Sequence, residues 1–296
     1  MTISVVVTGG SGFVGSLILD AIQERHHDWA LTVLDIQKPS DPRPKVEYLQ
    51  VDLLRESDID NAIATSKPEV VIHCANIVPP LVHRHNLKSE AEVISINVDG
   101  TRRLLKSCKQ HGVRIFVWTG SCTAVTDDVR YSYRNINEIY PTSTTSFVYG
   151  KSKALGERIV LAANSNPTFV TCALRPSVLF GPGDYQLVPS IHACIAKGET
   201  PFMLGDTENL WDVTYAPNVA YAHVLAVENL LTTKTAAGEA IFIQNNEPIT
   251  FRDFCLEVWK NFDHYPPFEI RIPFALASLA GYVLCLCHRS LDRFHV

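Results

Sequence analysis

Tyr149 and Lys153 are the residues of this 296-residue chain whose types and spacing could do chemistry together. They lie four positions apart, and the residues that follow continue a helical pattern, so both side chains project from one helix face. A phenol ordinarily ionises near pH ~10, but a nearby ammonium lowers that pKa because it stabilises the phenolate. The pair could therefore take a proton from a hydroxyl group. Such pairs also occur on exposed helices without a catalytic role.

A third candidate, Ser121, follows the apolar segment Ile115–Trp118. This segment is expected to be a strand, and ligands of open α/β sheets bind at the carboxyl ends of strands. The Ser121 hydroxyl could donate to a substrate oxygen and orient an alcohol for loss of its proton. The alternative is that this hydroxyl only caps the loop.

A glycine motif, Gly9-x-x-Gly12-x-x-Gly15, lies between the β-rich segment Ile3–Val7 and a helical pattern. Glycines at such a turn let a pyrophosphate approach the backbone amides at the positive end of the helix. The strand–turn–helix context is the one that a dinucleotide-binding fingerprint requires. We therefore expect cofactor binding by Gly9, Gly12, Phe13, Val14 and Gly15.

Two acidic residues follow later strands. Asp35 lies 20 residues after Gly15, where a carboxylate accepts hydrogen bonds from the adenosine ribose and repels a 2′-phosphate. This favours NAD, with NADP as the less favoured alternative because Lys38 and Arg43 are close in sequence. Asp52, with Leu53 beside it, follows the third strand and could bind the adenine amino group or cap a helix.

The elements that must position these residues alternate between strands and helices. Strands are predicted at residues 3–7, 31–34, 46–51, 70–74, 115–118 and 169–174, separated by stretches long enough for helices. Several are apolar on both faces, as in a parallel sheet covered on both sides. We predict an α/β fold with a doubly wound parallel Rossmann sheet. Residues 1–175 form the predicted NAD-binding domain and residues 176–296 a smaller substrate-binding lobe, some segments of which could return to the main sheet.

Composition excludes some functions. A net charge of −5 and a pI near 6.1 provide no basic face for nucleic acid. The eight cysteines form no C-x-x-C pair and do not cluster with histidines, so we predict reduced thiols and no metal site. The N-terminus reads as a first strand rather than a signal peptide, which predicts a cytoplasmic protein.

One apolar segment, Phe274–Cys287, contains 14 residues without a charge. A membrane span needs about 20 such residues. Two alternatives remain open: a helix buried against the lobe, or a peripheral contact with a membrane such as that of the endoplasmic reticulum.

Taken together, these motifs resemble those of the extended short-chain dehydrogenases, and in particular the 3β-hydroxysteroid dehydrogenase and sterol-4α-carboxylate 3-dehydrogenase family. Besides the glycine loop and the Tyr149/Lys153 pair, the resemblance rests on residues 51–53, 73–75, 97–101, 174–184 and 212–220. It implies that Ser121 and Tyr149 contact the reacting carbinol and that Lys153 contacts the nicotinamide ribose. It further implies cofactor contacts by Ala75, Pro176, Ser177 and Val178, and a homodimer.

The expected reaction is NAD-dependent oxidation of a 3β-type hydroxyl on a sterol, triterpenoid or meroterpenoid to the ketone, followed by loss of a 4-carboxylate where the substrate has one. Apolar segments at residues 77–82 and 202–204 favour a bulky apolar ring alcohol or ketone as substrate. A nucleotide-sugar epimerase or dehydratase is the alternative, with Arg252 and Arg271 as candidate ligands of a second pyrophosphate. A non-catalytic dinucleotide sensor would not need the Tyr149/Lys153 pair.

Overall fold

The computed structural model describes residues 2–79, 90–126, 131–142 and 147–278. The chain forms two compact units, which are considered separately below. Unit 1 comprises Met1–Gly183 and Thr214–Asn245, and unit 2 comprises Asp184–Val213 and Asn246–Val296.

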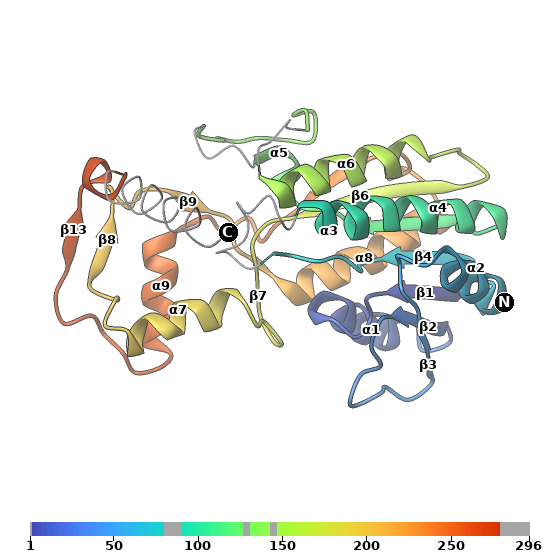
Figure 1. Ribbon diagram of the computed structural model, residues 1–296, viewed down its shortest axis with the longest axis horizontal. Coiled ribbons are helices and arrows are strands. Elements are labelled where there is room, and N and C mark those ends of the chain that lie inside the picture. The colour runs from blue at the N-terminus through green and yellow to red at the C-terminus, as the bar shows by residue number, and fades with distance from the viewer. Residues whose placement is uncertain (1, 80–89, 127–130, 143–146, 279–296) are drawn as a thin grey trace, which may run out of the picture. The chain divides into compact units, whose positions relative to one another are not determined.

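Unit 1 is built on a parallel sheet of seven strands (Figure 1). Its strands are β1 (Ser4–Thr8), β2 (Ala30–Asp35), β3 (Val46–Gln50), β4 (Val70–His73), β5 (Ile115–Thr119), β6 (Val170–Pro176) and β11 (Ala240–Ile243). Their order across the sheet is β11-β6-β5-β4-β1-β2-β3, and every neighbouring pair is parallel. The strand order reverses between β1 and β4, as in a doubly wound sheet. The predicted Rossmann fold is confirmed.

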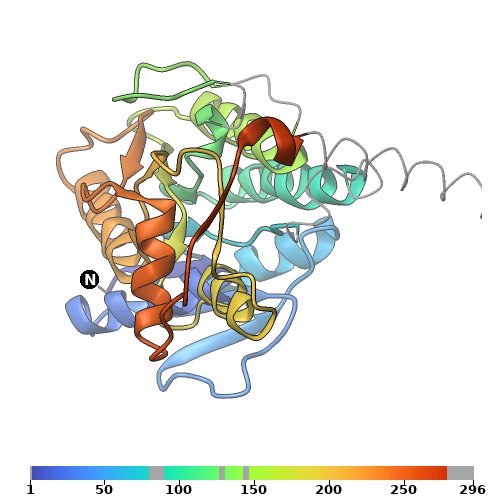
Figure 2. The same cartoon turned by 90° about the vertical axis from the view of Figure 1, so that its left-hand side faces the viewer.

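Helices cover both faces of this sheet (Figures 1 and 2). One face is covered by α1 (Phe13–Arg25) and α8 (Ala216–Leu231), the other by α2 (Glu56–Ser66), α4 (Thr101–Gln110) and α6 (Val148–Ala162). Shorter elements are α3 (Glu90–Ile94), the π-helical segment η3 (Ser95–Gly100), α5 (Thr123–Thr126) and the strand pair β7 (Leu179–Phe180) and β10 (Thr214–Tyr215). Side chains alternate along each strand, so Val5 and Val7 join the core under α1 and α8 while Val6 joins the opposite core.

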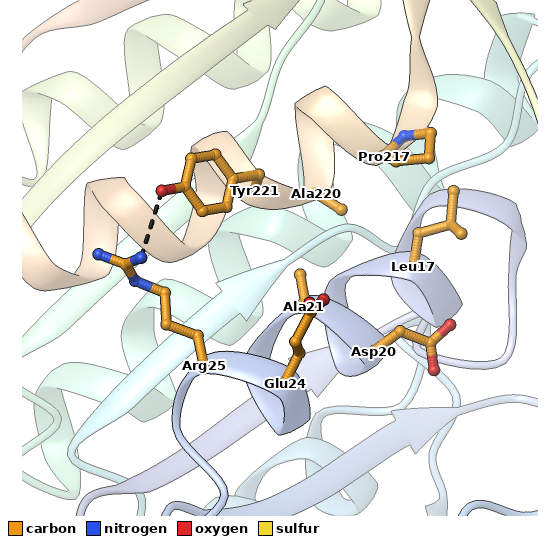
Figure 3. Close-up of a pocket in the computed structure, with 8 residues that line it drawn as sticks. All are labelled: Leu17, Asp20, Ala21, Glu24, Arg25, Pro217, Ala220 and Tyr221. Atoms are coloured by element: carbon orange, nitrogen blue, oxygen red, sulfur yellow. Dashed lines mark hydrogen bonds between the residues drawn. The ribbon is translucent and has the colours of Figure 1, made fainter.

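Hydrogen bonds and an ion pair join α1 to α8. Arg25 forms two hydrogen bonds with the Glu228 carboxylate, at 2.5 and 3.1 Å, and donates to the Tyr221 hydroxyl at 3.2 Å. Beside these contacts lies a surface pocket of about 460 Å³, with Leu17 and Pro217 in its wall (Figure 3). None of the residues predicted to do chemistry lines this pocket, so it is distinct from the candidate active site.

A buried ion pair joins α6 to β6. The Arg175 guanidinium donates to both carboxylate oxygens of Glu157, at 2.8 and 2.7 Å, and both side chains are almost fully buried. The guanidinium also lies 5.2 Å from the ring centre of Phe242 on β11. This pair fixes the helix that carries Tyr149 and Lys153 against the strand that leads to Pro176.

Unit 2 contains α7 (Leu187–Ala196), β8 (Phe202–Leu204), β9 (Leu210–Trp211), β12 (Ile249–Thr250), α9 (Phe251–Lys260) and β13 (Ile270–Ile272). Strand β8 pairs with β13 in parallel, and β9 pairs with β12 in antiparallel. Trp259 of α9 is buried, and its indole N–H donates to the carbonyl of Ile191 on α7 at 2.8 Å. Thr250 caps α9 by accepting from the amide of Asp253.

The predicted apolar segment 274–287 lies largely outside the described residues, which end at 278. Within the described ranges, no helix combines the length and the apolar character needed to cross a bilayer. Phe274 and Leu276, at the start of the segment, are exposed. The two alternatives for this segment stay predictions. The six cysteines in the described ranges are free thiols, and four of them are buried.

Candidate active site

Helix α6 brings Tyr149 and Lys153 together at the carboxyl edge of the sheet. Lys153 is 1% exposed, and its Nζ donates to the backbone carbonyl of Thr119 at 2.9 Å. The same Nζ lies 5.6 Å from the ring centre of Tyr149 and 5.0 Å from that of Trp118. Burial lowers the pKa of Lys153 to about 8. Its ammonium is therefore held in a poorly solvated place, where its field acts strongly on a neighbouring phenol.

The end of β5 carries the second part of the site. The Ser121 hydroxyl oxygen accepts from the amide and the hydroxyl of Thr123, at 3.2 and 2.9 Å. Both contacts use Ser121 as acceptor, so its own hydrogen can donate to another group. A side chain at Gly120 would begin 2.7 Å from the carbonyl oxygen of Leu174, so the strands at this point leave no room for one. Helix α5, which starts just after Ser121, packs against α6.

The glycine loop has the shape of an anion-binding turn. Gly9 has a positive φ of 69°, and a Cβ there would lie 2.7 Å from the Cα of Ala75. A Cβ on Gly15 would lie 2.1 Å from the carbonyl oxygen of Gly9. The N-terminus of α1, which starts at Phe13 with Gly12 as its N-cap, has no side-chain cap and no acidic residue in its first turn. Its first amides, including those of Phe13, Val14 and Gly15, can therefore serve a bound anion.

Asp35 is fixed at the end of β2. One carboxylate oxygen accepts from the amide of Ser11 at 3.0 Å, and the other accepts from the amide of Gln37 at 3.2 Å. Each oxygen keeps acceptor capacity for a hydroxyl. Arg43, one of the cations close to Asp35 in sequence, is occupied by a two-bond ion pair with Asp20 at 2.5 and 2.8 Å. Asp35 is thus placed to bind hydroxyl groups, as the sequence predicts for a ribose.

Asp52 has a local role as well. It accepts from the amide of Leu54 at 2.9 Å and lies 3.8 Å from the guanidinium of Arg55, just before α2. Leu53 packs against Gly100, where a Cβ would approach its side chain to 3.1 Å. The Asp52 side chain does not cap α2, whose N-cap is Arg55 and which has no side-chain cap, so the helix-capping alternative is wrong. Adenine binding by Asp52 stays a prediction.

A buried histidine, His73, connects the end of β1 to the junction of η3 and α4. The Ala75 amide donates to the Thr8 hydroxyl at 3.2 Å, and this hydroxyl lies 2.7 Å from Nδ1 of His73. On its other side, Nε2 of His73 lies 2.8 Å from the Thr101 hydroxyl, which donates to the Asn97 carbonyl. The Thr101 hydroxyl already donates its hydrogen to a carbonyl, so it accepts a hydrogen bond from Nε2. In the neutral ring Nδ1 is then the acceptor, and the Thr8 hydroxyl donates to it. Burial lowers the pKa of His73 to about 3, with a further contribution from the charge of Lys153, so the ring is neutral.

The same network continues to α6 through Asn97 of η3. The Asn97 side chain accepts from the amide of Ile77 at 2.8 Å and donates to the carbonyl of Ile77 at 3.0 Å. It also donates to the hydroxyl of Ser152, which in turn donates to the carbonyl of Tyr149 at 2.7 Å. The Asn97 side chain, on a π-helical segment, thus links the β4 loop to the first turn of α6. Such segments are frequent at functional sites.

The remaining predicted residues, 176–178, contact the neighbouring segments through backbone hydrogen bonds. The carbonyl of Pro176 accepts from the amide of Cys122 at 2.9 Å, and the carbonyl of Val178 accepts from the amide of Thr214 at 2.7 Å. The amide of Ser177 donates to the carbonyl of Ile243 at 3.4 Å. Residues 176–178 therefore lie next to the end of β5, which carries Ser121.

Sequence reasoning gave no role to His73, Thr119 or His223, although each is buried at the site. Their one signal in the sequence is a polar residue within an otherwise apolar run. That signal is weak, because the partners of these side chains are far away in the chain.

Comparison with known proteins identifies the group. The profile of the 3-beta hydroxysteroid dehydrogenase/isomerase family matches residues 6–274. This chain belongs to that family. The family that the sequence motifs predict is confirmed, and the chain is a dehydrogenase-type member of the extended short-chain group.

The relatives of this family member include two fungal enzymes. It is 36% identical over 293 residues to the decarboxylating sterol-4-alpha-carboxylate 3-dehydrogenase of Schizosaccharomyces pombe, covering 96% of this chain and 83% of the relative. It is 35% identical to the enzyme of the same name from Saccharomyces cerevisiae, covering 95% and 81%. Among solved structures, it is similar to the UDP-glucose 4-epimerase of Thermotoga maritima, with a TM-score of 0.76, 21% identity and coverage of 92% and 86%. At that identity, the likeness to the epimerase concerns the fold alone.

Proposed function

We propose that this protein uses NAD to oxidise the 3β-hydroxyl of a 4-carboxysterol to the ketone, after which the carboxylate leaves as carbon dioxide. The observation that carries this proposal is the placement of Lys153, whose ammonium is held by Thr119 against the ring of Tyr149 at the sheet edge that also carries Ser121. These are the groups that removal of a proton from a secondary alcohol needs.

The names of the relatives support the substrate class. The fungal proteins that align over almost the whole chain are named as 3-dehydrogenases of sterol-4-alpha-carboxylates. Arg252, a candidate for binding a second pyrophosphate, instead donates to the carbonyl of Thr200 at 2.8 Å and to Glu269 at 3.2 Å. This guanidinium also lies over the ring of Trp259. A sterol is thus favoured over a nucleotide sugar.

In the proposed reaction, the substrate hydroxyl accepts a hydrogen bond from Ser121 and gives its proton to Tyr149. The Lys153 ammonium stabilises the phenolate form of Tyr149 and so lowers the pKa at which this proton is accepted. Ser121 and the protonated Tyr149 then donate to the oxygen of the ketone. These fixed donors stabilise negative charge wherever it develops on that oxygen.

The residues around the glycine loop fit NAD. Gly9, Gly12 and Gly15 allow a tight turn in which a Cβ would meet the neighbouring backbone, and the amides of Phe13, Val14 and Gly15 can bind a pyrophosphate. Asp35 would bind the adenosine ribose, with Asp52 and Leu53 near the adenine, Ala75 near the phosphates or ribose, Lys153 at the nicotinamide ribose, and residues 176–178 beside the nicotinamide. When bound, NAD supplies the hydride acceptor. The ion pair of Arg43 with Asp20 further favours NAD over NADP.

Loss of the carboxylate follows from the position of the new ketone. A 4-carboxylate is β to the 3-ketone, so the bond between C4 and the carboxyl carbon can break with its electrons moving into the carbonyl. Carbon dioxide leaves, the enolate oxygen is stabilised by Ser121 and Tyr149, and C4 takes up a proton.

The proposal extends to the rest of the protein. Residues of unit 2 contribute to binding the apolar ring system, as the sequence predicts for the C-terminal part of the chain. The proposal includes a homodimer in the cytoplasm. For residues 274–287, the buried helix and the peripheral contact with the endoplasmic reticulum membrane stay alternative predictions.

The test is turnover of a substrate panel. Purified protein and NAD are incubated with 3β-hydroxysteroids, 4-carboxysterols, triterpenoid alcohols and UDP-sugars, while NADH absorbance and product mass are followed. We expect NADH formation and loss of carbon dioxide with 4-carboxysterols. Tyr149→Phe should lower kcat at least about 100-fold, because the proton acceptor is removed. Tyr140→Phe, at an exposed tyrosine, is the matched control and should not change kcat. Turnover of UDP-sugars alone, or full activity of Tyr149→Phe, would contradict the proposal.

A further inference from the structure

The position of the Lys153 ammonium depends on the peptide at the end of β5. Its hydrogen-bond acceptor is the backbone carbonyl of Thr119, and Thr119 is itself 5% exposed. The hydroxyl oxygen of Thr119 lies 2.8 Å from Nε2 of His223, a fully buried residue of α8. A helix on one face of the sheet is thus connected, through one threonine, to the ammonium of the candidate site.

The hydrogen bonds of His223 define its tautomer. Its Nδ1 lies 2.8 Å from the carbonyl oxygen of Val219, which can only accept, so Nδ1 carries the hydrogen. Burial lowers the pKa of His223 to about 4, although the bond to Val219 opposes the shift, so the ring is neutral and Nε2 is an acceptor. The Thr119 hydroxyl must therefore donate to Nε2. The thiol of Cys74 also interacts with the Thr119 side chain.

Burying the imidazole of His223 at this position costs free energy unless its hydrogen bonds compensate. Its neighbours on α8 include Ala220, Val224 and Val227, which belong to the apolar core under the sheet. Burying a polar ring among such side chains costs free energy that only its hydrogen bonds offset. An apolar side chain would pack here without that cost, but it would leave the Thr119 hydroxyl without an acceptor on this side.

We propose that His223 is a positioning residue for proton transfer: its Nε2 fixes Thr119 so that the Thr119 carbonyl holds the Lys153 ammonium against Tyr149. The inference rests on the proposed function, since it concerns the residues proposed to move the proton. It assigns His223 no contact with substrate or cofactor.

The test compares two amides at position 223. In His223→Gln, the longer side chain can place an oxygen where Nε2 lies, whereas His223→Asn reproduces only the donor to Val219. We expect His223→Gln to keep kcat within about twofold of the wild type, and His223→Asn to lose about tenfold. Thr119→Val, which keeps the carbonyl but removes the hydroxyl, should lose about as much. The double variant, His223→Asn with Thr119→Val, should have the same kcat as the less active single variant. Both substitutions break the same hydrogen bond between His223 and Thr119.

Two further readouts separate positioning from simple loss of stability. In His223→Asn and Thr119→Val, the acidic limb of the kcat–pH profile should move to higher pH by about one unit, since Tyr149 loses stabilisation of its phenolate. In the protein without cofactor or substrate, the ¹³Cε resonance of Lys153 should titrate at lower pH than in the wild type, because its ammonium loses a fixed acceptor. Cys74 and His73 also face Lys153, so both are left unchanged in every variant.

The control is Thr171→Val on the neighbouring strand β6. Its hydroxyl is also fully buried and donates to the Val160 carbonyl at 2.8 Å, so it tests the loss of a buried bond alone. It should lower the melting temperature without changing kcat. Equal activity of His223→Gln and His223→Asn, or an unchanged Lys153 titration in Thr119→Val, would overturn the inference. Absence of turnover in the wild type would contradict the proposed function instead, and the Lys153 titration would still decide the role of His223.

Discussion

At the scale of single residues, the candidate site buries an ammonium on which the proposed proton transfer depends. Lys153 is the ionisable side chain of α6 that is buried beside Tyr149, and burial brings its pKa from 10.5 down to about 8. At neutral pH the amine is still charged. The protein therefore keeps an ammonium where solvation is poor, as expected of a residue retained for chemistry and not for stability.

This yields a prediction for Lys153→Met. Between pH 8 and 10.5 the unfolded chain binds more protons at this lysine than the folded protein, so the folded wild type gains stability as pH rises through that window. Below pH 8 the full penalty applies. Lys153→Met should thus raise the free energy of unfolding by about 2 kcal/mol at pH 7, after allowance for the lost bond to Thr119, and by less at pH 9.5.

Urea unfolding at both pH values, with kcat measured alongside, checks this. The kcat of Lys153→Met should fall at least about 100-fold. Lys151→Met, two residues earlier on α6 at a half-exposed lysine, is the matched control and should change neither quantity much. A gain in stability that is the same at pH 7 and 9.5 would rule out charge burial as the cause.

At the scale of elements, α6 matters because it must hold its register against the sheet. Tyr149, Lys153 and Glu157 are spaced by four, so they lie along one helix face. Glu157 anchors this face to Arg175 of β6, two helical turns from Tyr149. The ion pair is buried, and removing one partner would leave an uncompensated charge in the interior.

We predict that Glu157→Gln lowers the free energy of unfolding by about 3–5 kcal/mol. Glu56→Gln breaks the exposed ion pair between α2 and α4, in which both side chains are more than half exposed, and should lower the free energy of unfolding far less than Glu157→Gln does. Chemical denaturation of the two variants makes the comparison. Equal losses would show that burial of the Arg175–Glu157 pair has no energetic consequence.

At the scale of the whole molecule, the sheet is completed by a segment that lies far along the chain. Residues 214–245 supply α8 and β11 to unit 1. Buried side chains of α8 form much of the core on one face of the sheet, and β11 pairs with β6 at its edge. The Rossmann sheet of this protein is therefore not contained in the N-terminal part of the chain.

A truncation series should reveal this. A chain that ends at residue 183 lacks α8 and β11, exposes the apolar face of β5 and β6, and should show no cooperative thermal transition. A chain that ends at residue 245 keeps every segment of unit 1 and should melt cooperatively and bind NAD. Circular dichroism and calorimetry distinguish them. Cooperative melting of the shorter chain would mean that the first 183 residues suffice.

The sequence by itself determined the local features of this protein. Strand periodicity, the Gly9–Gly15 turn and the Tyr149/Lys153 spacing depend on residues within one or two turns of one another, so they can be read directly. They were enough to predict the Rossmann sheet, and together with residues 51–53, 73–75, 97–101, 174–184 and 212–220 they predicted the family.

Only the tertiary structure decided what supports the site. His73 bonds to a threonine 65 positions away, and Thr119 bonds to His223 across 104 positions. No periodic pattern encodes such pairs, because each depends on which strand ends and helix faces the packed sheet brings together. The contacts that hold the Lys153 ammonium beside Tyr149 therefore exist only once β5 lies between α6 and α8.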